Sequence, residues 1–260
     1  MAVLASICVS RAELAAKDPD IFLPDAFDSE PDLVRLNLRI RDAMEVIGGA
    51  GQALAYMAIP FVLSVHHAYG VDCLRMIAGD YPAEADGESV ELSELHTRLM
   101  EDTGSRLPDD LLGLFDLLRA VRNRITHYAG VRGSHLNQKW RGLSRVAQDG
   151  WRNVAGRDFP TGPSTEELAL DVGELIGALM VVTRLGREMN EAVVGAIARD
   201  RWASIAAEDF RDVSAARFAQ QATRLRRFRN FVREFYGALE FNEGELVSAL
   251  QALSANRPER

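Results

Sequence analysis

Apolar residues recur along most of the chain at the spacing of an amphipathic helix. One such run follows Pro31 and Asp32. Another follows Pro108, where Asp109 and Asp110 suit the positive end of a helix dipole. No segment alternates apolar and polar residues beside a turn signal, as a half-buried strand would. The pattern predicts an all-α protein, a helical bundle of eight or nine helices.

Turn signals set the expected helix boundaries in the first half of the chain. Pro60 is expected to end one helix and open the next, which continues to about Ala78. A polar loop is expected over residues 81–89, and a further helix over residues 91–103. Gly130 is expected to stop the helix that Pro108 opens.

In the second half, glycines and prolines over residues 150–163 are typical of a linker. Ser164 with Glu167 matches a capping box that would open a long helix, and Asn242 with Glu245 matches one at a short final helix. Another long helix is expected over residues 208–239. We predict one helical domain over residues 1–205 and a C-terminal helical extension over residues 206–260, packed on it or continuous with it.

Residues 46–71 contain no Asp, Glu, Lys or Arg, and a helix of that length can span a bilayer. The segment also carries Gly48, Gly49, Gly51, Pro60 and the pair His66–His67, and its flanks show no positive-inside bias. We expect it to form helices buried in the bundle core, and we expect no membrane span. Carbonate-resistant pelleting would indicate the opposite. Residues 1–10 lack the basic start of a signal peptide. The two cysteines are expected to be reduced thiols in a cytoplasmic protein.

Composition excludes several classes of protein. Two cysteines, Cys8 and Cys73, cannot build a disulfide framework or a Cys-rich zinc site. The apolar share of 47% excludes a disordered chain, and a net charge of −8 argues against a general polyanion binder. Residues 119–157 nevertheless hold nine basic residues and one acid, and a second basic run covers residues 217–233. These runs indicate a local anion site, or else arginines that pair with acidic segments elsewhere.

The basic segment contains Arg122, Asn123 and His127 at the end of an amphipathic helix. This Arg-Asn-x3-His pattern resembles the signature of the HEPN superfamily (higher eukaryotes and prokaryotes nucleotide-binding domains). That signature is an Arg, a polar residue that is often Asn, and a His after four to six intervening residues. The resemblance implies a helical bundle, metal-independent endoribonuclease activity and a homodimer that joins two motifs in one cleft. It also implies a role in toxin–antitoxin or antiviral systems, with an antitoxin or defence protein as partner.

The residue types themselves suit the cleavage of RNA. Histidine exchanges a proton near neutral pH, and an arginine fork binds phosphate. RNA supplies its own nucleophile, the 2′-hydroxyl. We therefore expect His127 to act as general acid or base, Arg122 to stabilise the phosphate in the transition state and Asn123 to position either group. The products would be a 2′,3′-cyclic phosphate and a 5′-hydroxyl, and neither metal nor cofactor is expected.

Further basic and aromatic residues near the motif are expected to contact RNA. They are Arg119, Arg124, Tyr128, Arg132, His135 and Lys139. A toxin branch of the family carries Arg-x4-His-x-Tyr. Tyr128 directly follows His127 here, so the regulation of that branch is not carried over. His66 and His67 are adjacent and point to different helix faces, which does not suit a metal site.

Two other functions remain open at the level of sequence, a non-catalytic helical module and, through residues 46–71, a membrane-associated helical protein. Arg122 can instead pair with a carboxylate while the helix dipole favours His127 at its end. The chain would then be a non-catalytic helical module that binds RNA, a nucleotide or a protein partner. Convergence of Arg122, Asn123 and His127 on an open basic cleft would separate the two.

Overall fold

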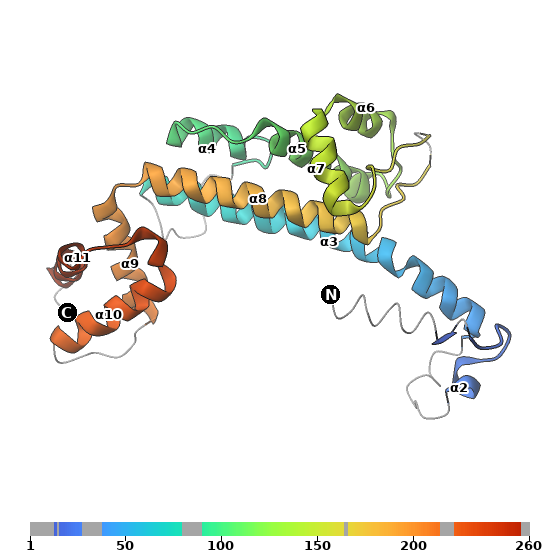
Figure 1. Ribbon diagram of the computed structural model, residues 1–260, viewed down its shortest axis with the longest axis horizontal. Helices are drawn as coiled ribbons and strands as arrows, with labels where there is room; N and C mark the ends of the chain where they lie inside the picture. The colour runs from blue at the N-terminus through green and yellow to red at the C-terminus, as the bar shows by residue number, and fades with distance from the viewer. Residues whose placement is uncertain are drawn as a thin grey trace. The chain divides into compact units, whose positions relative to one another are not determined.

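The computed structural model describes residues 13–14, 16–27, 38–79, 90–163, 166–213 and 221–255 (Figure 1). These residues contain the ten α-helices labelled α2 to α11, and their extended backbone pairs only in two isolated bridges, Phe22 with Arg39 and Val131 with Glu167. The all-α prediction is confirmed, with more helices than the eight or nine expected. The helices are α2 (Leu23–Ala26), α3 (Ile40–Ala78), α4 (Leu95–Thr103), α5 (Asp109–His127), α6 (Ser134–Gly142), α7 (Arg145–Ala155), α8 (Val172–Ala196), α9 (Arg199–Val213), α10 (Gln221–Phe235) and α11 (Glu243–Ala255), with a short 3₁₀ helix at Gly237–Leu239.

The chain divides into two compact units. The first comprises Met1–Val71, Ser89–His96 and Arg106–Met189, and the second comprises the remaining segments. The domain boundary expected between residues 205 and 206 falls inside α9, which belongs to the second unit. Several sequence features lie outside the described residues. They are Cys8, the helix start at Pro31 and Asp32, the loop over residues 81–89, Ser164 and Arg217.

In the first unit, α3 and α8 lie side by side and run in the same direction (Figure 1). Val172 lies beside Gly51 near the start of this contact, and the Tyr69 hydroxyl donates to the Gly186 carbonyl, 3.5 Å away, towards its end. Helix α5 packs on the same core. The residues that fill this core from the three helices are Ala55, Ile59, Leu63, Leu111, Leu114, Phe115, Leu117, Leu118, Val121, Ala178, Val181 and Leu185, each at most 3% exposed.

Pro60 lies inside α3 and does not end a helix there, so the predicted break is wrong. Proline removes one backbone donor, which is a local cost. Ile59 and Leu63, on either side of it, are both fully buried in the same core, and that burial holds the helix together across the proline. The Ser64 hydroxyl also donates to the Pro60 carbonyl, at 3.0 Å.

The expected linker over residues 150–163 begins inside a helix. Helix α7 continues to Ala155, because Trp151 is fully buried, and it ends at Gly156 in the left-handed conformation. The next helix, α8, begins at Val172, later than expected. Glu167 instead pairs in the bridge with Val131.

A capping box does open α8, four residues beyond Glu167. The Gly173 amide donates to Asp171 Oδ1 at 2.6 Å, and the Asp171 amide donates to Glu174 Oε2 at 2.7 Å. Glu174 is fully buried and also accepts from Arg157 Nε and Nη2, at 2.9 and 2.7 Å. The helix start predicted from Ser164 and Glu167 is therefore too early, and a different pair, Asp171 and Glu174, caps α8.

The second unit is held by its own apolar cluster, in which the Phe210 and Phe228 rings lie 5.3 Å apart. The single helix expected over residues 208–239 is wrong, because Phe210 of α9 and Phe228 of α10 are in contact, whereas one continuous helix would hold them about 27 Å apart. The capping box at α11 is confirmed. The Glu245 amide donates to Asn242 Oδ1 at 3.0 Å, and the Asn242 amide donates to Glu245 Oε2 at 2.7 Å.

Candidate functional site

The motif helix α5 ends where its sequence predicts. Asp109 and Asp110 lie in its first turn, its apolar face is buried in the core, and the chain leaves it through Gly130 at φ 80°. A Cβ on Gly130 would lie 2.4 Å from the Tyr56 hydroxyl, so only glycine fits there. That hydroxyl donates to the Leu168 carbonyl at 2.9 Å. Burial, with a smaller contribution from nearby Glu167, raises the pKa of Tyr56 to about 12.

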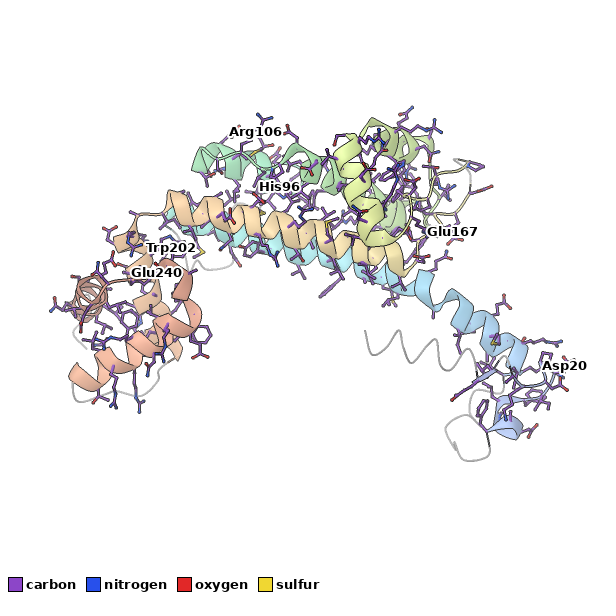
Figure 2. All side chains as sticks on the ribbon, in the orientation of Figure 1. Asp20, His96, Arg106, Glu167, Trp202 and Glu240 are labelled. Carbon is purple, nitrogen blue, oxygen red and sulfur yellow. The ribbon has the colours of Figure 1, made fainter. Side chains whose placement is uncertain are left out.

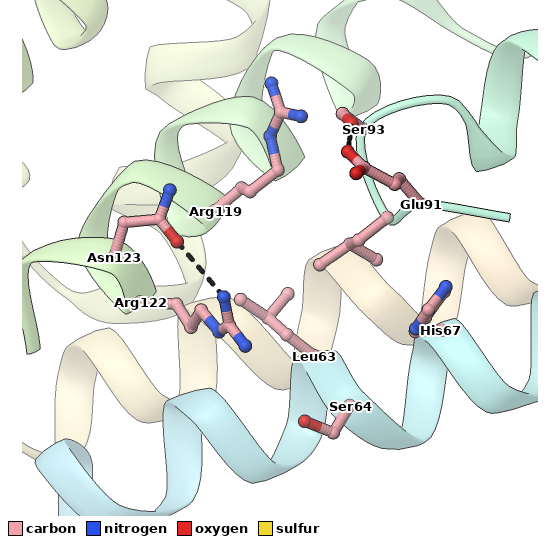
Figure 3. A pocket seen from close by; sticks show the side chains of 9 residues that line it. Leu63, Ser64, His67, Glu91, Ser93, Arg119, Arg122 and Asn123 are labelled. Atoms are coloured by element: carbon pink, nitrogen blue, oxygen red, sulfur yellow. Dashed lines mark hydrogen bonds between the residues drawn. The ribbon is translucent and has the colours of Figure 1, made fainter. Parts of the chain in front are cut away.

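A pocket of about 320 Å³ lies between α3 and the second half of α5 (Figure 3). Its third wall is the segment just before α4. Polar side chains dominate its lining, and two leucines form its apolar part. The lining residues are Leu63, Ser64 and His67 from α3, Glu91, Leu92 and Ser93, and Arg119, Arg122 and Asn123 from α5.

Arg122 and Asn123 are brought together in this pocket. Arg122 Nη1 donates to Asn123 Oδ1 at 3.2 Å, and Figure 3 shows the Arg122 guanidinium turned towards α3. Within the described residues, Arg122 forms no ion pair with a carboxylate. The alternative in which a carboxylate neutralises Arg122 therefore finds no support there. Most of its fork remains available to an anionic ligand.

Arg119 and Lys139 are engaged with an acid. Arg119 Nη2 lies 2.7 Å from Asp116 Oδ1, and Lys139 Nζ contacts the other carboxylate oxygen. Burial opposes the charged form of Asp116, but the hydrogen bonds from Lys139 and Arg119 outweigh it and hold the pKa of Asp116 below its ordinary value. Part of the basic segment is thus neutralised from within the bundle.

His127 lies outside the pocket, on the exposed last turn of α5. His127 comes five positions after Arg122, which places the two side chains about 140° apart around the helix axis. Asn123, four residues away, shares the face of His127. Within the described residues, the His127 side chain has no hydrogen-bond or ion-pair partner. One copy of the chain therefore does not converge the three motif residues on one cleft.

Of the residues expected to contact RNA, Tyr128 and His135 are exposed and Arg124 is half-buried beside Tyr128. The Arg124 guanidinium sits 4.5 Å from the centre of the Tyr128 ring, and Tyr128 is 56% exposed. His135 is exposed at the start of α6. The exposed aromatic ring and its neighbouring cation are the chemistry on which an RNA base stacks.

Arg132 is the exception, because it is only 4% exposed. Its guanidinium donates to the carbonyls of Pro163 and Glu167, at 3.4 and 3.3 Å. Gly162 leaves it the room, since a Cβ there would lie 2.2 Å from Arg132 Nη1. Arg132 therefore secures the loop after α5 and does not face a ligand, contrary to the expectation from its charge.

Sequence reasoning missed the pocket residues His67, Glu91 and Ser93. His67 Nε2 lies 2.6 Å from the Val90 carbonyl, so that nitrogen carries the proton and Nδ1 is left as an acceptor. The signal was the pair His66–His67. Neighbouring residues on a helix point about 100° apart, so one can face the core while the other faces a pocket.

His66 faces the core and contacts a second buried histidine. His66 Nε2 lies 2.9 Å from His96 Nε2, and both rings pack on Phe115. Burial, then the charge of His67, lowers the pKa of His66 to about 4. Burial, then His66 and Arg119, lowers the pKa of His96 to about 3. Figure 2 shows His96 in the first unit, among the side chains of its core. Within the described residues, no three His, Cys, Asp or Glu side chains are placed to hold a metal ion.

One face of α3 exposes apolar side chains. We call the set Val46, Ala53, Met57, Phe61 and Val65 the α3 stripe; Val46, Met57, Phe61 and Val65 are 53–69% exposed. By length and composition alone, α3 is long and apolar enough to cross a membrane, and only 17% of its most apolar stretch is buried. The expectation that residues 46–71 lie in the core holds only for the opposite face.

Comparison with protein-family models, curated proteins and solved structures finds no match to the chain.

Proposed function

We propose that the chain is a metal-independent endoribonuclease. The observation that carries the proposal is Arg122, which Asn123 holds in an open pocket without a carboxylate partner among the described residues, on the same helix as the exposed His127. An unneutralised arginine fork beside an accessible histidine suits phosphoryl transfer. The Arg-Asn-x3-His pattern, which resembles the HEPN signature, supports the same reaction.

In this reaction the 2′-oxygen of the RNA attacks the adjacent phosphorus and the bond from phosphorus to the 5′-oxygen breaks. Arg122 stabilises the negative charge that develops on the phosphate oxygens. His127 accepts the 2′-hydroxyl proton or donates one to the departing 5′-oxygen, and water completes the other transfer. Asn123 orients Arg122 through their hydrogen bond. The products are a 2′,3′-cyclic phosphate and a 5′-hydroxyl.

We also propose that the active form is a homodimer joined through the α3 stripe. Since Arg122 and His127 point about 140° apart on one helix, a second copy is needed to bring both groups to one phosphate. The stripe lies in a segment without charged residues, so two copies can pair along it without repulsion. It is about 28 Å long. The exposed Ile176 and Leu179 of the neighbouring α8 extend it towards the ~800 Å² per partner that a stable interface needs.

The biological setting proposed with this activity is cytoplasmic toxin–antitoxin or antiviral defence, with an antitoxin or defence protein as partner. Its basis is the resemblance of the Arg-Asn-x3-His pattern to the HEPN signature. Ile59 and Leu63 of α3 are fully buried, so insertion of α3 into a bilayer would unpack the first unit.

Cleavage of a mixed RNA pool, with and without EDTA, tests the endoribonuclease proposal. We expect cleavage that survives EDTA, leaves cyclic-phosphate ends and falls by about 10²- to 10⁴-fold in His127→Ala. Arg145→Ala is the matched control, because Arg145 is an exposed arginine of the same basic segment on α7. Full activity in His127→Ala, or cleavage abolished by EDTA, would overturn the proposal.

The placement of His127 outside the pocket favours a second candidate function, a non-catalytic module that binds RNA or a nucleotide. In that case the protein binds RNA and leaves it intact. Arg122→Ala weakens the binding, while His127→Ala does not.

A further inference from the structure

We propose that the pocket between α3 and α5 binds one ribonucleotide unit of the RNA. Its phosphate contacts Arg122 and Asn123, and its 2′-hydroxyl, the one free hydroxyl of a ribose within RNA, lies at the end of the pocket formed by Glu91 and His67. The inference rests on the proposed function and adds to it how a ribose is recognised, by residues that the Arg-Asn-x3-His pattern does not include.

The phosphate end of the pocket is formed by α5. Arg122 offers a fork of donors with no carboxylate partner among the described residues, and the Asn123 amide nitrogen is a further donor beside it. Figure 3 shows both side chains on the same side of the pocket. Arg119 adds positive charge next to them, although Asp116 partly offsets it.

The opposite end of the pocket is formed by acceptors. Ser93 Oγ donates to Glu91 Oε2 at 3.2 Å, which holds the carboxylate at the pocket wall. His67 donates a hydrogen bond from Nε2 to the Val90 carbonyl, so Nδ1 is the ring nitrogen left to accept one. A carboxylate repels a phosphate and binds a hydroxyl proton.

A ligand that satisfies both ends has an anionic group on one side and hydroxyl donors on the other. A sugar phosphate has this arrangement, and RNA presents it at every nucleotide through the 2′-hydroxyl. The volume of about 320 Å³ is near the lower limit of ligand pockets, so it accommodates one unit. Leu92, which is half-buried, supplies apolar surface against which the sugar can pack.

Calorimetric titration of the purified full-length protein tests this assignment with three ligands. They are adenosine 3′-monophosphate, 2′-deoxyadenosine 3′-monophosphate and inorganic phosphate. We expect the ribonucleotide to bind about tenfold more tightly than either of the others, since each lacks a hydroxyl that pairs with a charged acceptor. Equal affinities for the ribo and deoxy forms would overturn the inference.

Variants assign the two ends separately. Arg122→Ala is expected to weaken both nucleotides. Glu91→Gln and His67→Gln are expected to weaken only the ribonucleotide and to bring its affinity near that of the deoxy form. Glutamine at position 67 keeps a donor for the Val90 carbonyl, so the local fold is retained, and thermal unfolding of each variant checks this. Arg145→Ala is the control expected to match the parent.

The outcome is distinguishable from that of the cleavage experiment. If the protein cleaves RNA but its Glu91→Gln and His67→Gln variants still prefer the ribonucleotide, the pocket assignment is overturned and the nuclease proposal stands. If the protein binds the ribonucleotide selectively through Glu91 and His67 but does not cleave RNA, the pocket assignment is supported and the nuclease proposal is overturned.

Discussion

At the scale of single residues, Gly130 fixes the exit from the motif helix. Gly130→Ala would place an alanine in the left-handed backbone conformation. Its Cβ would also meet the Tyr56 hydroxyl, which donates to the Leu168 carbonyl. We expect the free energy of unfolding to fall by about 2–4 kcal/mol in urea denaturation. Gly156→Ala is the matched control, because Gly156 has φ 76° with open space around it, and we expect a loss of about 1 kcal/mol there. Equal losses would show that the contact with Tyr56 contributes nothing.

The pair His66–His96 makes stability depend on pH. Both pKa values are lower in the folded protein, about 4 and about 3, than the ~6.5 of an unfolded histidine, so the unfolded chain binds more protons below pH 6.5. The pair's contribution is fully present above pH 6.5 and is lost as the pH falls towards 4. Each histidine then contributes a slope of up to about 1.4 kcal/mol per pH unit.

Urea denaturation at pH 7, 6 and 5 measures this slope. We expect the double variant His66→Leu/His96→Leu to flatten it, while His135→Gln, which changes an exposed histidine, keeps it. A parent protein whose free energy of unfolding is constant from pH 7 to pH 5 would contradict the buried-pair account.

At the scale of elements, the start of α8 depends on a buried charge. Glu174 is fully buried, and Arg157 gives it two hydrogen bonds. Arg157→Ala would leave the carboxylate with only the Asp171 amide as a donor among the described residues, and we expect a loss of about 2–4 kcal/mol in thermal or urea unfolding. The contrasting variant is Arg145→Ala, since Arg145 meets Asp149 at 3.7 Å on the surface and should cost at most about 0.5 kcal/mol. Comparable losses in both would refute the role given to Glu174.

Element boundaries were predictable where one local signal decides them. Pro108 opens α5, Gly130 follows its end, and Asn242 with Glu245 caps α11, because each signal acts within a few residues of the chain. The boundaries predicted at Pro60 and Gly150 were wrong, because burial of Ile59 and Trp151 outweighs the local preference of proline and glycine to end a helix. Side chains from distant segments supply that burial, and neighbouring sequence does not reveal it.

The candidate site was likewise predictable only where neighbouring residues in the sequence identify it. Arg122 and Asn123 were identified from the motif, and the structure places them in a pocket. The burial of Arg132 depends on Gly162 and on carbonyls over thirty residues away, so its charge alone suggested a surface role. His67 enters the pocket only because α3 and the segment before α4 meet there, which the local pattern does not show.

At the scale of the whole molecule, the α3 stripe predicts the oligomeric state. Phe61→Lys places a charge in the middle of the proposed interface, and we expect sedimentation to change from dimer to monomer with little loss of thermal stability. Val146→Lys is the matched control, because Val146 is equally exposed, 69% against 68%, but lies on α7 away from the stripe. A parent protein that sediments as a monomer at micromolar concentration would overturn the dimer.

The stripe also has a consequence for dosage. If the two copies complete one catalytic centre, the amount of active enzyme follows the square of the monomer concentration while most of the chain is monomeric. In a cell that makes little of the protein, nearly all of it would then be inactive monomer. A modest rise in expression would raise RNA cleavage disproportionately. The uncharged face of one helix would thus set a threshold in copy number below which the host is spared.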